Sequence, residues 1–336
     1  MELSKFDSFG FCDSRAYMLF SLCLQKFFLI IIIIIISDGV DGVILFSDIL
    51  TPLPAIGVDF SVSEGGKINI DAIRTREDFA TLKQDVCAED FAIKTPFVGQ
   101  VLEELKQELS GGKATLLGFC GMPFTVASYL MEGKTGVPTG FAQCKTMMKE
   151  DPYLVHDILQ LLSDTLSEYA RYQIEHGAQV LQLFDSWAGH MPKKQYDEFC
   201  APYQKRVIQR IRETHPQIPI IIYMAPGPYS QGGQRLEQLA QTGADFVSVD
   251  HTVDMAFACE IIPNEIGLQG NLDPQLLKDG PLDEIRKATE RILDQVKGRK
   301  HIMNLGHGID AATPEEHAAY FIQTVQNYPR GMQETE

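Results

Sequence analysis

The stretch Asp41-Gly-Val-Ile-Leu-Phe-Ser-Asp-Ile-Leu-Thr-Pro-Leu-Pro54 contains an apolar run that ends in polar residues and prolines. Val43 to Phe46 form an uninterrupted apolar run, which is typical of a strand covered on both faces. Pro52 and Pro54 soon prevent further ladder pairing. Asp48 is therefore predicted to follow a rigid strand with its carboxylate facing a loop-lined cleft. The common alternative for such an aspartate is a helix cap or a turn.

Similar apolar runs recur along the chain, separated by stretches with helical periodicity. The seven predicted strands are Val43–Phe46, Ala114–Phe119, Val180–Phe184, Ile218–Tyr223, Phe246–Val249, Ile266–Gln269 and His301–Leu305. Asp151-Pro152 predicts an N-cap followed by proline at the first helical position, for a helix that runs to about Glu175 and closes at Gly177. Asp273-Pro274 predicts a second such start, and Thr313-Pro-Glu-Glu316 predicts a capping box.

Seven strands alternating with helices indicate an α/β fold with one parallel sheet, and their number favours a (β/α)8 barrel, the TIM barrel. No Gly-x-Gly-x-x-Gly or P-loop follows any predicted strand, which argues against a doubly wound cofactor-binding fold. The barrel would be one strand short. The first strand is predicted to be missing or replaced by an Ile-rich segment, which divides the chain into an aberrant apolar segment, residues 1–40, and a barrel domain, residues 41–336.

The first forty residues differ in character from the rest. Ala16 to Leu24 are mostly apolar, Gln25-Lys26 interrupts, and Phe27 to Ile36 end in an isoleucine homopolymer. Ten residues are too few to span a bilayer as a helix, and no basic region or small-residue cleavage site indicates a signal peptide. Three interpretations remain open: translated non-coding sequence, an extra buried strand, or a membrane-associated segment.

The composition limits the class of partner. The net charge of −16 argues against binding to nucleic acids and anionic membranes. Seven cysteines, an odd number with no Cys-x-x-Cys, favour a reducing compartment and argue against a disulfide framework or a structural zinc site. No His-Glu-x-x-His occurs, so no metal is expected. A soluble protein of the cytoplasm or of the plastid stroma is predicted, with membrane association disfavoured.

Polar residues follow four of the predicted strands, at the end of the barrel where functional groups collect. Asp48 follows the first strand, and Tyr129 lies in the segment after the second. Ser186 follows the third strand in Leu183-Phe-Asp-Ser-Trp-Ala-Gly-His190, and His307 lies between two glycines after the last. The alternative roles are packing for Tyr129, helix capping for Ser186 and a structural role for His307.

Five phrases in this order resemble the uroporphyrinogen decarboxylase family. They are Phe-Ser-Asp-Ile-Leu-Thr-Pro, Gly-x-Pro-Phe-Thr-x-x-x-Tyr-x-x-Glu-Gly, Phe-Asp-Ser-Trp-Ala-Gly, Gln269-Gly-Asn-Leu-Asp-Pro274 and Asn-Leu-Gly-His-Gly, and they cover roughly residues 41 to 330. The resemblance implies a (β/α)8 barrel, a homodimer and a step of haem and chlorophyll synthesis that needs no cofactor. In that step the four acetate side chains of uroporphyrinogen III become methyl groups, which gives coproporphyrinogen III.

The resemblance also implies roles for the four candidate residues. Decarboxylation needs an electron sink, which a protonated pyrrole ring provides. Asp48 matches the carboxylate that faces the centre of the macrocycle, where it can accept pyrrole N–H groups and stabilise the developing cation. Tyr129, Ser186 and His307 match positions that hydrogen-bond substrate carboxylates, and each can donate a hydrogen bond to an anion.

The chain departs from the family in one motif. Family members carry a sequence of the type Arg-Gln-Ala-Gly-Arg-Tyr on the first barrel strand, and its arginines hold substrate carboxylates. Residues 1–40 contain no match, and the role is not transferred to Arg15, the nearest basic residue. An octa-anionic substrate would meet an acidic protein with little local compensation. We therefore expect this polypeptide to be weakly active or inactive.

The sequence allows two other functions. The first is a truncated, non-catalytic relative that dimerises through an intact surface. The second is a zinc-dependent methyltransferase of the related barrel group, which would need thiolate and imidazole ligands at strand ends. The chain has no His-x-Cys pair, and Gly308 follows His307, which argues against the second.

Overall fold

Seven parallel strands form one curled sheet in a computed structural model that describes residues 39–329, except 46, 63–67, 113 and 135–139. The strand order is β1-β4-β5-β6-β7-β8-β9, and every neighbouring pair is parallel. The bounds are β1 Gly42–Ile44, β4 Thr115–Gly121, β5 Val180–Phe184, β6 Ile220–Tyr223, β7 Phe246–Ser248, β8 Gly267–Gln269 and β9 His301–Ile302. A strand is found at each predicted place, and most are shorter than predicted, above all the last, which was predicted to reach Leu305. Phe46, at the end of the first predicted strand, lies outside the described residues.

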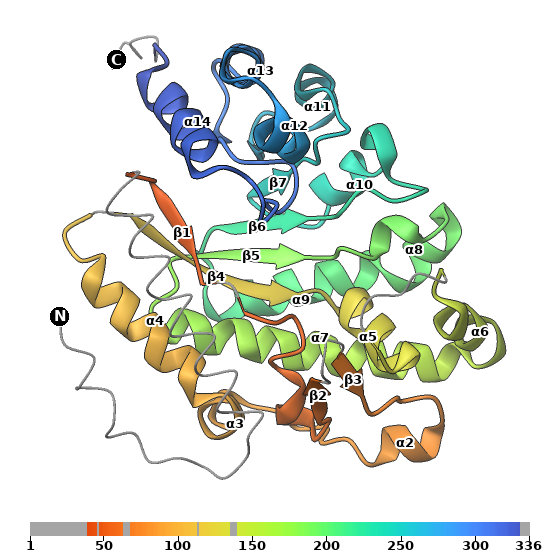
Figure 1. Ribbon diagram of the computed structural model, residues 1–336. Coiled ribbons are helices and arrows are strands. Elements are labelled where there is room, and N and C mark those ends of the chain that lie inside the picture. The colour runs from red at the N-terminus through yellow and green to blue at the C-terminus, as the bar shows by residue number, and fades with distance from the viewer. Residues whose placement is uncertain (1–38, 46, 63–67, 113, 135–139, 330–336) are drawn as a thin grey trace.

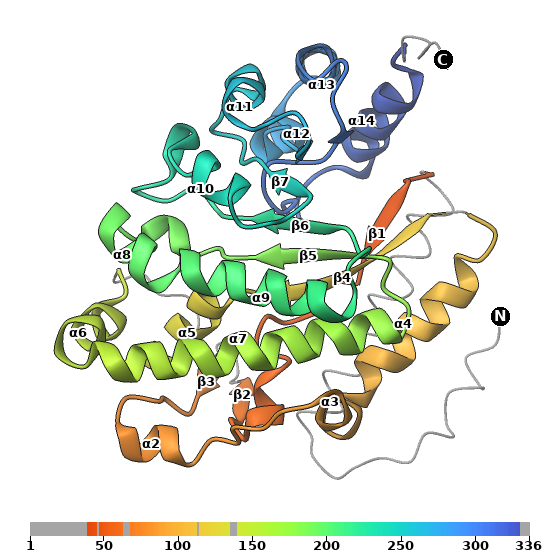
Figure 2. The same cartoon turned by 180° about the vertical axis from the view of Figure 1, so that it is seen from behind.

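Helices connect the strands and cover the outer face of the sheet. Their bounds are α2 Arg76–Ala80, α3 Ala88–Lys94, α4 Pro96–Glu108, α5 Pro123–Glu132, α6 Ala142–Glu150, α7 Pro152–Glu175, α8 Lys193–Phe199, α9 Ala201–Thr214, α10 Leu236–Ala240, α11 Met255–Ile261, α12 Pro274–Asp279, α13 Leu282–Gln295 and α14 Glu315–Asn327. In Figure 1 strands β4 and β5 point towards α5 and α8. Figure 2, seen from behind, shows α7 and α9 lying across the rear face of these two strands. The curled parallel sheet and its helices confirm the predicted α/β barrel class.

Two of the three predicted helix starts are confirmed. The Asp151 side chain accepts a hydrogen bond from Leu154 N at 3.1 Å, and the Asp273 side chain accepts one from Gln275 N at 2.8 Å. Each aspartate precedes a proline at the first helical position, where a missing N–H costs nothing.

The predicted capping box at Thr313 is wrong. Helix α14 begins at Glu315 with Pro314 at the N-cap position and no side-chain cap. Asp310 forms a turn instead, because its side chain accepts a hydrogen bond from Ala312 N and its carbonyl accepts one from Thr313 N. This turn holds the Thr313 backbone away from the helix, and the Thr313 hydroxyl has no partner within the described residues.

An antiparallel hairpin after β1 was not predicted. Strand β2, Phe60–Val62, pairs with β3, Ile68–Ile70. Each strand is only three residues long, and short strands give a weak periodicity signal.

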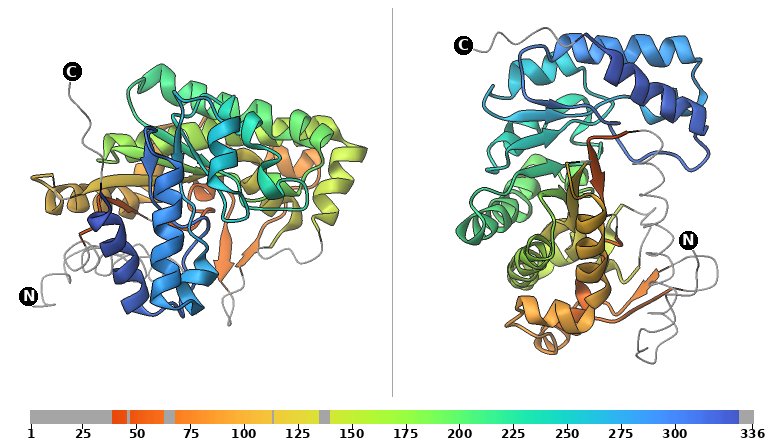
Figure 3. Two further views of the ribbon diagram at one scale, coloured as in Figure 1. Left: turned by 90° about the horizontal axis from the view of Figure 1, so that it is seen from above. Right: turned by 90° about the vertical axis from the view of Figure 1, so that its left-hand side faces the viewer.

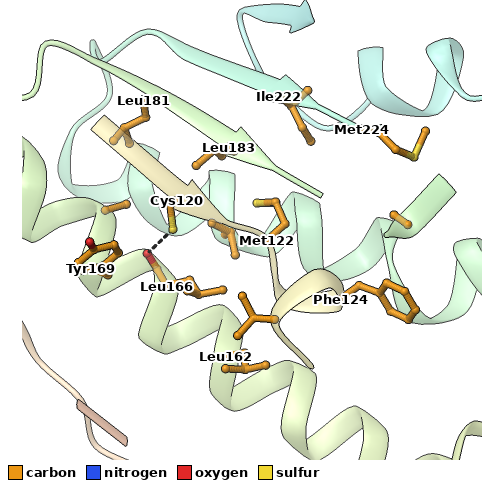
Figure 4. Packing of buried hydrophobic residues seen from close by; sticks show 14 of the residues in the cluster. Cys120, Met122, Phe124, Leu162, Leu166, Tyr169, Leu181, Leu183, Ile222 and Met224 are labelled. Carbon is orange, nitrogen blue, oxygen red and sulfur yellow. Dashed lines mark hydrogen bonds between the residues drawn. The ribbon is translucent and has the colours of Figure 1, made fainter. Parts of the chain in front are cut away.

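The core lies between the sheet and α7. Cys120 of β4 packs against Leu166 of α7, and its thiol is 3.8 Å from the Leu166 carbonyl (Figure 4). Leu162 of α7 and Leu181 of β5 are also fully buried in this layer. The apolar runs therefore become strands because both of their faces are covered, one by helices and one by the barrel interior.

The barrel is open on one side of the described structure. Strands β1 and β9 form the two edges of the sheet and do not pair with each other. Figure 3 shows β1 (red) at one edge with the C-terminal helices (blue) beyond it. A cleft of about 2010 Å³ follows the concave face, lined by Leu117, Phe184 and Tyr223 of the sheet and by Phe321 of α14. The predicted Ile-rich replacement of the first strand lies outside the described residues.

Truncation of a core residue tests this packing. We expect Leu166→Ala to lower the free energy of unfolding by about 2–5 kcal/mol, because it removes buried methyl groups and leaves a cavity. Ile93→Ala is the matched control, since Ile93 is 74% exposed. Urea denaturation followed by circular dichroism measures both. Equal losses for the two variants would contradict the placement of α7 against the sheet.

Among the helices described, none combines the length and the apolar character needed to cross a membrane.

Candidate active site

Asp48 follows β1 at the carboxyl end of the sheet and is half-buried. Its Oδ1 accepts a hydrogen bond from Leu50 N at 2.8 Å, and its carbonyl accepts one from Thr51 N at 3.0 Å. Oδ1 thus stabilises a turn, which was the alternative role for this aspartate. Oδ2 accepts no hydrogen bond from the described residues. Burial raises the pKa of Asp48, and the hydrogen bond from Leu50 partly offsets this increase.

Tyr129 lies on α5 within electrostatic range of Asp48. Its ring is half-buried and meets the Trp187 ring edge-on, with the centroids 6.1 Å apart. Burial raises the pKa of Tyr129, and the charge of Asp48 raises it further. Tyr129 therefore both packs against Trp187 and lies near Asp48. Its helix follows β4, so it lies at the same end of the sheet as the Asp48 carboxylate.

Ser186 occupies the turn that follows β5, between Asp185 and Trp187. The alternative role as a helix cap is not observed. The 3-10 turn Ala188–His190 has Trp187 at its N-cap position without a side-chain cap, and α8 has Pro192 there. The Ser186 hydroxyl has no hydrogen-bond partner among the residues that the structure describes, so it is available to a ligand.

His307 is exposed between Gly306 and Gly308. Its ring meets the Tyr223 ring edge-on at 6.4 Å, and the Tyr223 hydroxyl donates a hydrogen bond to the Gly306 carbonyl at 3.2 Å. A Cβ at Gly306 would lie 2.2 Å from the backbone nitrogen of His251, so only glycine fits there. The tight loop explains how His307 is held beside the last strand.

Tyr223 connects His307 to the loop of Ser186. Its ring contacts Phe184 edge-on at 5.8 Å, and Phe184 is the last residue of β5. Tyr129 and Ser186 lie beside Trp187, and Asp48 lies within electrostatic range of Tyr129. Of the four candidates only His307 is among the residues that line the cleft, together with Tyr223 and Phe184. The structural role of Tyr223 was not predicted, although its position at a strand end was the available signal.

The barrel interior also contains a polar layer that was not predicted. Gln269 Nε2 donates hydrogen bonds to Gln182 Oε1 and to Ser248 Oγ, each at 3.0 Å. All three residues are buried and line the cleft. Polar residues within otherwise apolar strands are the feature of the sequence from which this layer could have been predicted.

Positive charge is scarce in this cleft. Within the described ranges, Lys297 and Arg299 are the cationic side chains that line it, and both precede β9 at the amino end of the strands. Lys297 pairs with Asp294 at 2.6 Å, while Arg299 donates to four backbone carbonyls. Both therefore already have partners in the protein, and both lie at the end of the strands opposite to Asp48. The described residues also contain no group of three or more His, Cys, Asp or Glu side chains that could hold a metal ion.

A parallel barrel with a carboxylate and several hydroxyl groups at the carboxyl ends of its strands has the architecture of a barrel enzyme. A family model described as uroporphyrinogen decarboxylase matches residues 34–328. A protein named uroporphyrinogen decarboxylase from Prochlorococcus marinus is 46% identical over 292 residues, which cover 85% of this chain and 78% of that relative. One of the same name from a Synechococcus species is 45% identical over 286 residues, covering 84% and 77%. The chain belongs to the uroporphyrinogen decarboxylase family, as its motifs predicted.

Solved structures support the fold alone. A methyltransferase from Methanosarcina mazei superposes with a TM-score of 0.73 at 18% identity, covering 90% of this chain and 85% of that one. A B12-independent methionine synthase from Shewanella sp. W3-18-1 gives a TM-score of 0.58 at 10% identity, with the same coverage. At these identities the likeness concerns the barrel and does not extend to the reaction.

Proposed function

We propose that this protein removes the carboxyl groups of the four acetate side chains of uroporphyrinogen III and gives coproporphyrinogen III, a step of tetrapyrrole biosynthesis. The family match across residues 34–328 carries the proposal. The proximity of Asp48 to Tyr129, and of Tyr129 and Ser186 to Trp187, supports it, because the substrate offers both pyrrole N–H groups and carboxylates.

Asp48 has the central role in the proposed mechanism. Proton transfer to a pyrrole carbon turns the ring into a cation, which accepts the electron pair left when the acetate carboxyl leaves as CO2. A proton then adds to the methylene carbon to complete the methyl group, and the ring carbon releases the first proton, which restores the pyrrole. Asp48 Oδ2 accepts pyrrole N–H groups and stabilises the cation, while Oδ1 keeps its bond to Leu50. The group that supplies the protons is not assigned.

The remaining candidates bind the substrate's carboxylates. The Tyr129 and Ser186 hydroxyls each donate a hydrogen bond, and His307 donates one through a ring nitrogen. The raised pKa of Tyr129 keeps its phenol protonated at neutral pH, so it remains a donor. No cofactor takes part in the proposed reaction.

Further properties belong to the same proposal. Residues 41–336 form the barrel domain, residues 1–40 are a separate segment, and the protein is a homodimer. The pathway is that of haem or chlorophyll, in the cytoplasm or in the plastid stroma.

An assay with the protein in excess over uroporphyrinogen III, under anaerobic reducing conditions, tests this function. Products are oxidised and separated by their number of carboxylates. We expect slow loss of acetate carboxylates with all four propionates retained, because the arginine motif is absent. If neither this chain nor a version that carries the motif yields decarboxylated product, the protein is a non-catalytic relative and the proposal fails. No specific observation favours a zinc-dependent methyltransferase.

A further inference from the structure

We propose that Asp185 is a positioning residue that fixes Trp187, Ser186 and Tyr129 relative to one another. It does so through a buried hydrogen-bond network that joins β5, α5 and α9. The proposal concerns the geometry of the site and rests on the proposed function only for its kinetic consequence.

The Asp185 carboxylate is fully buried and uses both oxygens. Oδ1 accepts hydrogen bonds from Thr125 N at 3.1 Å and from Thr125 Oγ1 at 2.7 Å. Oδ2 accepts one from Gln204 Nε2 at 2.7 Å. Thr125 lies in the first turn of α5 and Gln204 lies in α9, so one side chain links three elements that are far apart in the sequence.

The network reaches the site residues in two directions. The Thr125 hydroxyl accepts a hydrogen bond from Trp187 N at 3.1 Å, which closes the turn that carries Ser186. Tyr129 lies one helical turn after Thr125 on the same face of α5. A shift of Thr125 therefore moves the indole that packs on Tyr129 and the helix that carries Tyr129.

The surroundings explain why a carboxylate is needed here. Among the described residues Asp185 forms no ion pair. Burial raises the pKa of Asp185, and the hydrogen bonds from Thr125 and Gln204 offset part of this increase. The Tyr196 hydroxyl donates to Gln204 Oε1 at 2.8 Å, and the buried Arg235 guanidinium lies 5.2 Å from the centre of the Tyr196 ring. Because an ionised carboxylate only accepts hydrogen bonds, Asp185 orients the Gln204 amide with its N–H towards Oδ2 and its oxygen towards the Tyr196 hydroxyl. An asparagine at position 185 would present an N–H to one of these donors and leave a buried group unpaired.

The single tryptophan of the chain gives a direct readout, because it lies inside the network. Asp185→Asn and Thr125→Val are expected to shift Trp187 emission to longer wavelength and to increase its quenching by acrylamide at least twofold. Thr125→Ser retains the hydroxyl and is expected to match the parent. The control is Thr289→Val, since Thr289 is equally buried but bonds only to Ile285 O within α13. Far-UV circular dichroism verifies that each variant is folded.

The kinetic measurement uses this chain or the version that carries the arginine motif, depending on which of them decarboxylates uroporphyrinogen III. We expect Thr125→Val to lower kcat/KM about tenfold to a hundredfold, since displacements of about 1 Å cost this much, and Thr125→Ser to restore it. If Thr125→Val folds with Trp187 emission unchanged, the positioning role is wrong, whatever the activity. If every form lacks decarboxylase activity while the emission shifts as expected, the proposed function fails and the positioning role stands. If Asp185→Asn does not fold, Thr125→Val alone tests the positioning role.

Discussion

Replacement of residues 1–40 by a segment that carries Arg-Gln-Ala-Gly-Arg-Tyr is expected to raise kcat/KM for uroporphyrinogen III by about 10²–10⁴-fold. Each arginine that pairs with a substrate carboxylate contributes about 1.5–3 kcal/mol, so two contribute enough for this factor. The described cleft supports the expectation, because its basic residues Lys297 and Arg299 are already engaged at the far end of the strands.

The comparison needs a control that separates charge from barrel closure. The same segment with both arginines replaced by glutamine can fill the opening between β1 and β9 without adding positive charge. We expect this control to gain stability in urea denaturation but little activity. If the original chain turns over the substrate as fast as the arginine version, the arginines of the motif do not contribute to the reaction and the prediction is wrong.

Asp48→Asn, introduced into the most active form, is expected to lower kcat by about 10²–10³-fold with a smaller change in KM. The amide keeps an oxygen for the hydrogen bond from Leu50 N, so the turn is preserved while the charge that stabilises the pyrrole cation is lost. Asp41→Asn is the matched control, because Asp41 is exposed at the other end of β1. A loss of similar size in both variants would show that net charge, not the position of Asp48, controls the rate.

The pH dependence of kcat follows from the environment of Asp48. Burial raises its pKa, so Asp48 takes up a proton at a higher pH than a free aspartate, whose pKa is about 3.9. The acid limb of the kcat profile should lie above that value and should disappear in Asp48→Asn.

Stability gives an independent check of the same shift. Between the ordinary and the raised pKa the folded state keeps a proton that the unfolded chain has released, so the contribution of Asp48 to stability is lost as the pH rises through this window. Asp48→Asn should therefore be more stable than the parent at neutral pH, as measured by urea denaturation. The stability of Asp48→Asn minus that of the parent should therefore increase from acid to neutral pH. A decrease of this difference would contradict the burial of the Asp48 carboxylate.

Much of the fold could be predicted because its signals are local. Mostly apolar runs located all seven strands, and aspartate followed by proline located the starts of α7 and α12. The start of α14 was misplaced, because Asp310 competes for the backbone just before it, and this competition is set by the turn geometry. The β2–β3 hairpin escaped prediction because its strands are very short.

The site was predictable residue by residue but not as a network. The positions of Asp48, Tyr129, Ser186 and His307 followed from strand ends and motifs. The bond between Asp185 and Thr125 joins residues sixty positions apart, and no periodicity reports such a contact. The same holds for Tyr223, whose ring separates His307 from the Ser186 loop. Their roles depend on the closing of the sheet, which only the three-dimensional structure provides.

In the proposed mechanism Asp48 is the cation-stabilising carboxylate of a porphyrinogen decarboxylase site. The most direct test is a single-turnover measurement of coproporphyrinogen III formation by the arginine-bearing form, with and without Asp48→Asn. We predict rapid formation with Asp48 and a rate about 10²–10³-fold lower in Asp48→Asn. Equal rates for the two proteins would contradict the claim.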